Sequence, residues 1–184
     1  MDATKRLMDE HRVIERAIAA LEAAARRLDS GRPIRAGFFI DAADFIKEFA
    51  DGAHHRKEEG LLFPAMEAAG VPRDGGPIGV MLAEHEEGRR LTRGMRAAAE
   101  RLAAGDEAAR GDVQRNALGY VHLLRQHIIK EDGVLFPMAD RVLRDRERTE
   151  LESAFERIQR EQAGEGVHER YLGLAESLER EAEE

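Results

Sequence analysis

Apolar residues recur at three- and four-residue spacing along almost the whole chain, and no segment alternates between apolar and polar positions. This periodicity is typical of helices that bury one face, and it predicts no strand. We expect helices over about residues 4–28, 34–68, 77–104 and 107–143, followed by a fifth helix that begins near residue 149.

Turn residues separate these helices. The sequences DSGRP at 29–33 and GVPRDGGP at 70–77, and the Gly-Asp pair at 105–106, are typical of loops. Short connections favour antiparallel neighbours. We therefore expect an all-α protein, with an up-down-up-down four-helix bundle over residues 1–145. A C-terminal helical extension over residues 146–184 should pack outside the bundle or across one end.

Two of the long helices contain residues that interrupt helical hydrogen bonding. Gly60 and Pro64 predict a kink or an early stop in the second helix. Gly133 and Pro137 repeat the signal in the fourth helix, in the same register.

The fifth helix has boundary signals of its own. Thr149 and Glu152 match the capping-box pattern that begins a helix. Glycines at 164 and 166 predict an interruption over 164–166, after which the helix resumes to the end.

Composition narrows the chemistry. The 184 residues include no cysteine, which excludes disulfides, thiolate zinc sites, iron–sulfur clusters and thiol catalysis. The net charge of −8, with Lys and Arg scattered, argues against nucleic-acid binding. The N-terminus lacks the apolar stretch of a signal peptide, and no apolar run reaches the length of a membrane span. We expect a cytoplasmic protein with no nucleic-acid or membrane partner.

An eleven-residue phrase occurs twice. Residues 54–64 read HHRKEEGLLFP and residues 127–137 read HIIKEDGVLFP, with seven of the eleven positions identical. A further His precedes each copy, His11 by 43 residues and His85 by 42, and each follows a Glu directly. The chain therefore looks like two helical pairs that each offer two His and one Glu.

Within each copy, a His and a Glu stand four residues apart on one helix face: His54 with Glu58, and His127 with Glu131. One such pair alone would be read as a helix-face contact worth roughly a few tenths of a kcal/mol. The repeated set would place two carboxylates in a bundle core with no evident Lys or Arg partner. Burying each unpaired carboxylate would cost roughly several kcal/mol. Two cations would offset that cost, so the sequence predicts a two-metal site between the halves.

Ligand type limits the metal. Four imidazoles and two carboxylates suit iron, manganese or zinc. Each carboxylate can bridge two ions and leave coordination positions open. The charge of a diferric pair exceeds that of the two carboxylates, so we expect an oxo or hydroxo bridge. Open positions on a redox-active pair would admit dioxygen, peroxide or nitric oxide.

The chain resembles the hemerythrin-like (HHE cation-binding) family of non-haem di-iron proteins over roughly residues 4–143. The motifs that carry the resemblance are EH, HHRKEEGLLFP, EHEEGR and HIIKEDGVLFP. Oxygen-carrying members have a further His four residues after the third-helix His, where this chain has Arg89. The resemblance is therefore to the four-His, two-Glu bacterial members rather than to reversible oxygen carriers. It implies a di-iron site with the ligands His11, His54, Glu58, His85, His127 and Glu131.

Three other histidines receive different interpretations. His55 lies at the edge of the inward face and is a candidate additional ligand or hydrogen-bonding partner, although Ile128 takes its place in the second copy. His122 is predicted on the surface. His168 could cap one end of the site, but helix packing is the simpler interpretation.

Neighbouring residues complete the prediction. Lys57 and Lys130 should extend outward beside the site, and Phe63 and Phe136 should fill the bundle and exclude water near the metals, or simply pack in the core. The run 84–87 on the third helix should otherwise be a solvated face.

These observations favour a di-iron protein that binds or turns over a small oxidant or gas, and as an enzyme it would be a di-iron oxidoreductase, for which the resemblance allows catalase-like activity. The alternative is a non-catalytic gas or iron sensor, or an iron store. A third interpretation is repair of iron centres, although repair members commonly carry a cysteine pair that is absent here. A purely structural bundle ranks last.

Overall fold

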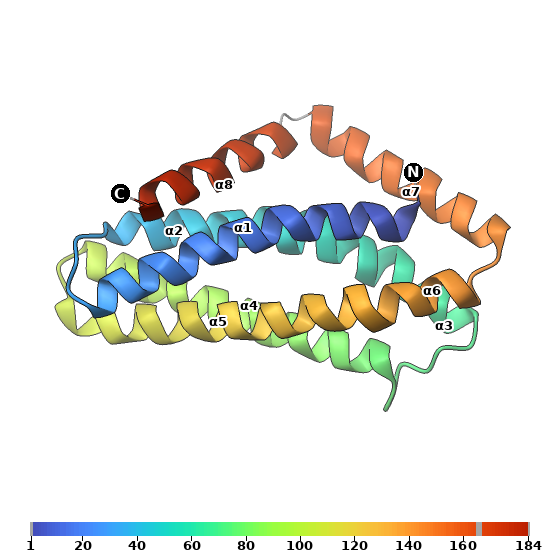
Figure 1. The fold of residues 1–184 in the computed structure, drawn as a ribbon, viewed down its shortest axis with the longest axis horizontal. Coiled ribbons are helices and arrows are strands. Elements are labelled where there is room, and N and C mark those ends of the chain that lie inside the picture. Colours follow the sequence, from blue (N-terminus) through green and yellow to red (C-terminus); the bar gives the residue numbers. More distant parts are fainter. Residues whose placement is uncertain (1, 165–166, 184) are drawn as a thin grey trace.

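The computed structural model describes residues 2–164 and 167–183, and over 161–164 and 167–168 it describes the backbone alone. Every regular element in this part of the chain is helical (Figure 1). The predicted all-α class is confirmed. No helix among the described residues is both long enough and apolar enough to cross a bilayer.

Four antiparallel rods form the bundle, and the chain runs up, down, up and down through them (Figure 1). The first rod is α1 (Ala3–Asp29) and the third is α4 (Pro77–Ala103). The second and fourth rods are each assembled from consecutive segments. The second comprises α2 (Ala36–Phe45), π-helical turns (Ile46–His55 and Glu58–Leu62) and α3 (Phe63–Ala68). The fourth comprises a 3₁₀ turn (Glu107–Ala109), α5 (Arg110–Lys130), π-helical turns (Glu131–Leu135) and α6 (Phe136–Val142).

The second and fourth rods continue where Gly and Pro predicted a kink or a stop. Proline has no N–H to donate to the carbonyl four residues earlier, and its ring clashes with that carbonyl in an α-helix. Wider π-helical turns precede each proline, and Pro64 and Pro137 then fall in the first turn of an α-segment, where the missing N–H is not needed. The π-helical turn directly before each proline begins at the glutamate of the repeated phrase, Glu58 or Glu131.

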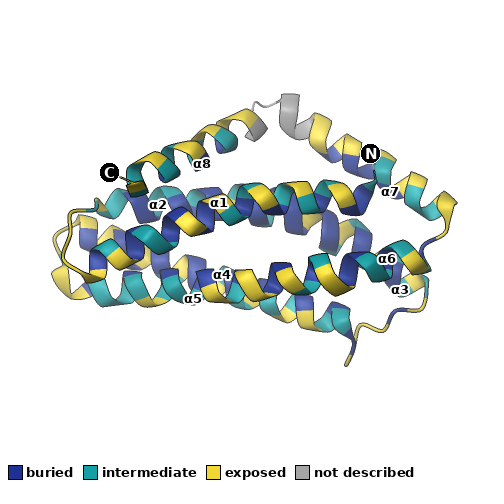
Figure 2. Cartoon of the chain, in the orientation of Figure 1, coloured by how far each residue is buried: buried dark blue, intermediate teal, exposed yellow. Residues whose placement is uncertain are grey.

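The bundle core is divided along its length. The inward faces of the rods are buried (Figure 2). The larger apolar cluster includes Ile14, and the smaller one at the other end includes Leu7 and Phe136. On α1, the buried His11 lies between Leu7 and Ile14, and the other rods repeat this order. A layer of polar side chains therefore separates two apolar clusters in the middle of the bundle.

The C-terminal extension consists of α7 (Asp145–Gly164) and α8 (Val167–Glu183), and it lies along the outside of the bundle over α1 (Figure 1). α8 packs on α1 and α2, where Leu178 joins the larger cluster, and α7 places Phe155 in the smaller one. The predicted interruption coincides with the end of α7 and the start of α8, although residues 165–166 lie outside the described part.

The predicted start of the fifth helix at Thr149 is wrong. α7 begins at Asp145, because the Glu147 carboxylate accepts a hydrogen bond from the Arg144 N–H at 2.8 Å and so caps an earlier turn. The Thr149 hydroxyl instead donates to the Asp145 carbonyl within the helix.

Candidate metal centre

Four histidines, one from each rod, direct their Nε2 atoms into the polar layer. The Nε2 atoms of His11 and His54 lie 3.0 Å apart, and those of His85 and His127 lie 3.1 Å apart. Two nitrogens that bind one ion at about 2.1 Å and at right angles would be separated by about 3 Å. The imidazoles thus form two pairs, each with the spacing of ligands to a common cation.

Glu58 lies between the two pairs. Its Oε1 is 3.5 Å from Nε2 of His54, and its Oε2 is 3.5 Å from Nε2 of His85. The carboxylate is completely buried. One oxygen therefore faces each imidazole pair, which is the arrangement of a carboxylate that bridges two ions.

Glu131 repeats this arrangement from the opposite rod. Its Oε2 is 3.1 Å from Nε2 of His11, and its Oε1 is 3.1 Å from Nε2 of His127. Apart from these ring nitrogens, none of the four oxygens of Glu58 and Glu131 has a hydrogen-bond partner among the described residues. A buried carboxylate without partners is costly, so these oxygens fit metal ligands better than structural acids.

His55 adds a fifth imidazole. Its ring stacks on that of His85, with the centroids 3.8 Å apart, and its ring nitrogens reach one of the two donor groups. Within each group the donor atoms all lie within 4.8 Å of one another. One group comprises His11, His54, Glu58 and Glu131, and the other comprises His55, Glu58, His85 and His127. The duplicated halves are therefore not equivalent.

Arg89 stands at the position where oxygen carriers have a His, and it points to other partners. Its guanidinium donates to Asp51 and to Glu59, each at 2.7 Å. Asp51 in turn lies 3.3 Å from Nδ1 of His55. The second rod thus places an imidazole beside the second donor group, and Arg89 binds the carboxylate that contacts this imidazole.

Each of the four inward histidines has its Nδ1 against a carboxylate. The pairs are His11 with Asp132 at 2.7 Å, His54 with Glu10 at 3.0 Å, His85 with Glu59 at 2.7 Å, and His127 with Glu84 at 2.9 Å. A carboxylate at Nδ1 favours the tautomer whose Nε2 lone pair is free for a metal, and it makes the imidazole a stronger ligand.

Sequence reasoning missed these four carboxylates, although the signal was present. A Glu precedes both His11 and His85, and an acid follows both Glu58 and Glu131. The assignment of Glu84 to a solvated face is wrong, because its side chain turns inward along the bundle to reach the neighbouring rod.

The outward orientation predicted for Lys57 is also wrong. Its side chain is only 2% exposed and its ammonium binds Glu10, with the Phe155 ring of α7 centred 6.0 Å away. Lys130 binds Glu84 in the same way but remains 38% exposed. Each lysine turns toward the bundle because Glu10 or Glu84 needs a countercharge. Lys57 is more deeply buried than Lys130 because α7 of the C-terminal extension covers it.

The charges in the site shift the pKa values of its histidines. Burial by itself lowers the pKa of His54, but the charge of Glu58 and the hydrogen bond to Glu10 raise it to about 10. His127 is raised to about 9, because the charge of Glu131 outweighs burial. Burial and the charge of His85 lower the pKa of His55 to about 3. Protons on the imidazoles thus balance the carboxylates in the absence of a cation.

The sequence analysis also made predictions for two phenylalanines and two further histidines. Phe63 and Phe136 are buried and stack on the imidazoles of His85 and His11, with ring centroids 6.0 and 5.5 Å apart. They close the side of the site that faces the smaller apolar cluster. His122 is exposed, and the side chain of His168 lies outside the described residues.

Comparison with known proteins agrees with this geometry. Three uncharacterized proteins, one of Mycobacterium bovis and two of Mycobacterium tuberculosis strains, are 30% identical to the chain over 163 residues. The aligned region covers 89% of this chain but 63% of theirs, so the chain spans less than two thirds of these relatives. No solved structure gives a significant match. The sequence model of the hemerythrin HHE cation-binding domain matches residues 2–139, which contain both donor groups, and the chain therefore belongs to this family of metal-binding helical domains.

Proposed function

We propose that this chain is a non-haem di-iron protein that binds or turns over a small oxidant or gas, such as peroxide, dioxygen or nitric oxide. The observation that carries the proposal is the set of four buried carboxylate oxygens without hydrogen-bond partners, which face two imidazole pairs. Six nitrogen and oxygen ligands of this kind suit iron, and they would also accept manganese or zinc.

The ligands divide between two ions. His11 and His54 would hold one ion, and His85 and His127 would hold the other. Glu58 and Glu131 would contribute one oxygen to each ion. We assign His55 to the second ion, because it belongs to that donor group and its lowered pKa keeps it neutral.

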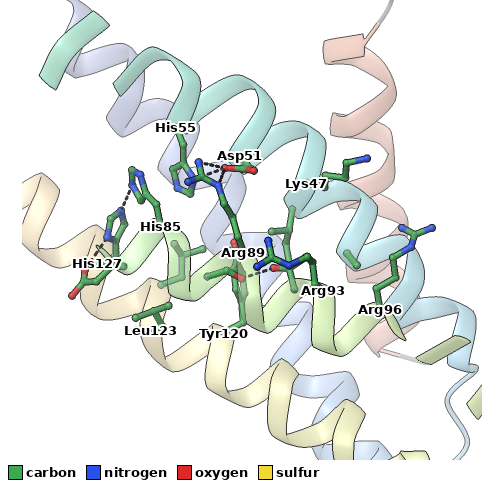
Figure 3. A pocket seen from close by; sticks show the side chains of 16 residues that line it. Lys47, Asp51, His55, His85, Arg89, Arg93, Arg96, Tyr120, Leu123 and His127 are labelled. Atoms are coloured by element: carbon green, nitrogen blue, oxygen red, sulfur yellow. Dashed lines mark hydrogen bonds and ion pairs between the residues drawn. The ribbon is translucent and has the colours of Figure 1, made fainter. Parts of the chain in front are cut away.

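An iron pair, when bound, supplies one-electron redox steps and open positions for a small ligand. The protein residues do the rest. The carboxylates at Nδ1 fix the imidazoles in place, and Phe63 and Phe136 exclude water from one side. On the other side a cavity reaches His55, His85 and His127 (Figure 3). Small molecules would therefore approach the second ion rather than the first.

The proposal is tested by loading the purified chain with iron and recording metal content and absorption. We expect two irons per chain and oxo-to-iron charge-transfer bands that change when peroxide or nitric oxide is added. The His122→Ala variant serves as the control, because this exposed residue lies outside both donor groups. The proposal would be contradicted if these bands were absent. It would also be contradicted if neither ligand altered the bands and the chain removed peroxide no faster than free iron does.

A second candidate function is non-catalytic sensing, and one set of contacts favours it. The ring of Phe155 on α7 lies over Lys57, whose ammonium binds Glu10, and Glu10 holds Nδ1 of His54. A change at the first ion could thus reach the C-terminal extension. Sensing predicts that nitric oxide or oxidation alters hydrogen exchange in α7 without turnover, whereas an enzyme would consume peroxide.

A further inference from the structure

The cavity that reaches the second donor group is much larger than a gas or peroxide requires. Its volume is about 210 Å³, more than ten times the roughly 10–15 Å³ that holds one water molecule. It runs between the second rod, α4 and α5 (Figure 3). This size is sufficient for an organic molecule.

Most of the cavity wall is apolar. Ala43 and Ile46 line it from the second rod, and Leu123 and Leu124 line it from α5. Gly88 on α4 presents no side chain, and a Cβ there would lie 3.5 Å from the Tyr120 ring. Walls of this kind, with a few placed polar groups, are typical of small-molecule sites.

Tyr120 supplies one of these polar groups. Its hydroxyl is buried, and it has no hydrogen-bond partner among the residues that the structure describes. Tyr120 also lines the cavity. Burial, with the charge of Asp51, raises the pKa of Tyr120 above its usual value, so the hydroxyl is a neutral donor. A buried hydroxyl without a partner costs free energy, and an acceptor in the cavity would relieve that cost.

Arg93 supplies a positive charge at the outer edge of the cavity. Arg93 is exposed at the cavity edge and makes no ion pair within the described part of the chain. It follows His85 by eight residues on α4, and Tyr120 precedes His127 by seven on the antiparallel α5. At 1.5 Å per residue, the Cα atoms of Arg93 and Tyr120 therefore lie about 10–12 Å along the bundle from those of the imidazoles. The Tyr120 ring itself lies against Gly88, between Arg93 and His85 on α4.

The other charged residues of the cavity are already paired. Asp51 accepts from Arg89, and Glu84 accepts from Lys130. Arg96 binds Asp44 and Glu100, and Lys47 lies beside Glu48 at 3.5 Å. Figure 3 shows Arg93 and Arg96 at one end of the cavity and the imidazoles at the other. The charge available to a ligand is therefore positive and lies far from the donor groups.

We propose that this cavity binds a small organic carboxylate with an extended apolar body. The carboxylate pairs with Arg93 and accepts a hydrogen bond from Tyr120. The apolar body lies against Ile46 and Leu124 and reaches toward His85. Binding extends the proposed function by naming the class of molecule that meets the second ion, but the carboxylate site does not itself require iron.

Calorimetric titration of octanoate into the purified 184-residue chain tests this site, with octan-1-ol and octylamine as head-group controls. We expect octanoate to bind more tightly than octan-1-ol or octylamine. Arg93→Gln should weaken octanoate binding about tenfold, because one charge-assisted hydrogen bond is lost. The affinity for octan-1-ol should stay the same in this variant. Tyr120→Phe should also weaken octanoate. Arg90→Gln is the matched control, because Arg90 pairs with Glu87 and does not line the cavity.

A second variant tests the location. Gly88→Leu should fill the cavity and abolish octanoate binding, while its iron content stays at that of the unaltered chain. Failure of octanoate to bind, equal binding by Arg93→Gln, or preference for octylamine would each overturn the carboxylate site. Because iron content is counted separately, a chain that holds two irons but no octanoate would refute this inference and leave the di-iron proposal intact.

Discussion

Glu58 and Glu131 face each other across the bundle, each completely buried and each with one oxygen toward either imidazole pair. Within the part of the chain that the structure describes, no hydrogen-bond donor other than these ring nitrogens reaches either carboxylate. Their counterparts outside the pair, such as Glu10, are satisfied by a lysine and a histidine. Glu58 and Glu131 therefore differ from Glu10, and this difference favours the proposed metal site over a buried salt-bridge network.

Replacing Glu58 or Glu131 should make the melting temperature nearly independent of added metal. In the unaltered chain, zinc or iron should raise the melting temperature, because binding to the folded state alone stabilises it. Glu58→Gln and Glu131→Gln should gain little from metal, because each variant lacks a carboxylate that faces both imidazole pairs. Thermal unfolding with and without metal measures both effects. Glu87→Gln, at a surface pair with Arg90, should behave like the unaltered chain, and an equal metal response in all four proteins would contradict the assignment.

The carboxylates at Nδ1 should tune affinity without being ligands. Glu10→Gln and Glu84→Gln should each weaken zinc binding by about 10–100-fold, because each carboxylate holds an imidazole of the proposed centre. Competition with a chromophoric chelator measures the affinity. Glu22→Gln on α1 is a suitable control, since Glu22 binds Arg26 and Arg125 away from the site. Unchanged affinity in both test variants would show that these acids act only in packing.

The two lysines of the repeated phrase should differ. Lys57→Met removes an ammonium that is buried beneath α7, whereas Lys130→Met removes one whose side chain is 38% exposed, and the partners Glu10 and Glu84 are exposed to a similar extent. We expect Lys57→Met to destabilise the fold and weaken zinc binding more than Lys130→Met does. Urea unfolding and zinc competition on the two variants provide the comparison. Equal effects would mean that burial by the C-terminal extension does not matter.

The raised histidine pKa values predict an alkaline loss of stability in the metal-free chain. His54 and His127 have folded pKa values of about 10 and 9, above the ordinary value of 6.5. Their contribution is therefore fully present below pH 6.5 and is lost as the pH rises through 9 to 10. Melting temperatures between pH 6 and 10 should fall for the unaltered chain and fall less for His54→Gln. Parallel pH curves for the two proteins would refute this account.

The C-terminal extension should stabilise the bundle without holding metal. Leu178 on α8 is buried in the larger apolar cluster, so Leu178→Ala should cost about 2–5 kcal/mol of unfolding free energy. Its iron content should remain that of the unaltered chain at temperatures where it is folded. Chemical unfolding and metal analysis check the two statements separately. A loss of iron in the folded variant would show that α8 takes part in the site.

The fold was readable from the sequence because apolar periodicity and turn residues indicated the same four rods. The course of the second and fourth rods was not readable. Gly60 and Pro64 disrupt an α-helix, and only the tertiary packing shows that π-helical turns take up the disruption. Helix periodicity also could not show that α7 begins at Asp145, because that start depends on how Glu147 turns back to the Arg144 N–H.

The candidate metal site was likewise only partly predictable from the sequence. Repetition brought out the residues whose types recur in both halves, and the structure brings those six side chains together. His55 was harder to place, because Ile128 occupies its position in the second copy and a symmetric pattern gives it no counterpart. The role of Glu84 depends on contacts between rods, which spacing along one helix does not reveal.

The most direct test of the central claim is the number of irons bound per chain, measured by native mass spectrometry after anaerobic loading. We predict two irons in the unaltered chain and in His122→Ala, and loss of the paired ions when both Glu58 and Glu131 are replaced by alanine. A chain that holds no iron, or a doubly substituted chain that still holds two, would contradict a centre built on these bridging carboxylates.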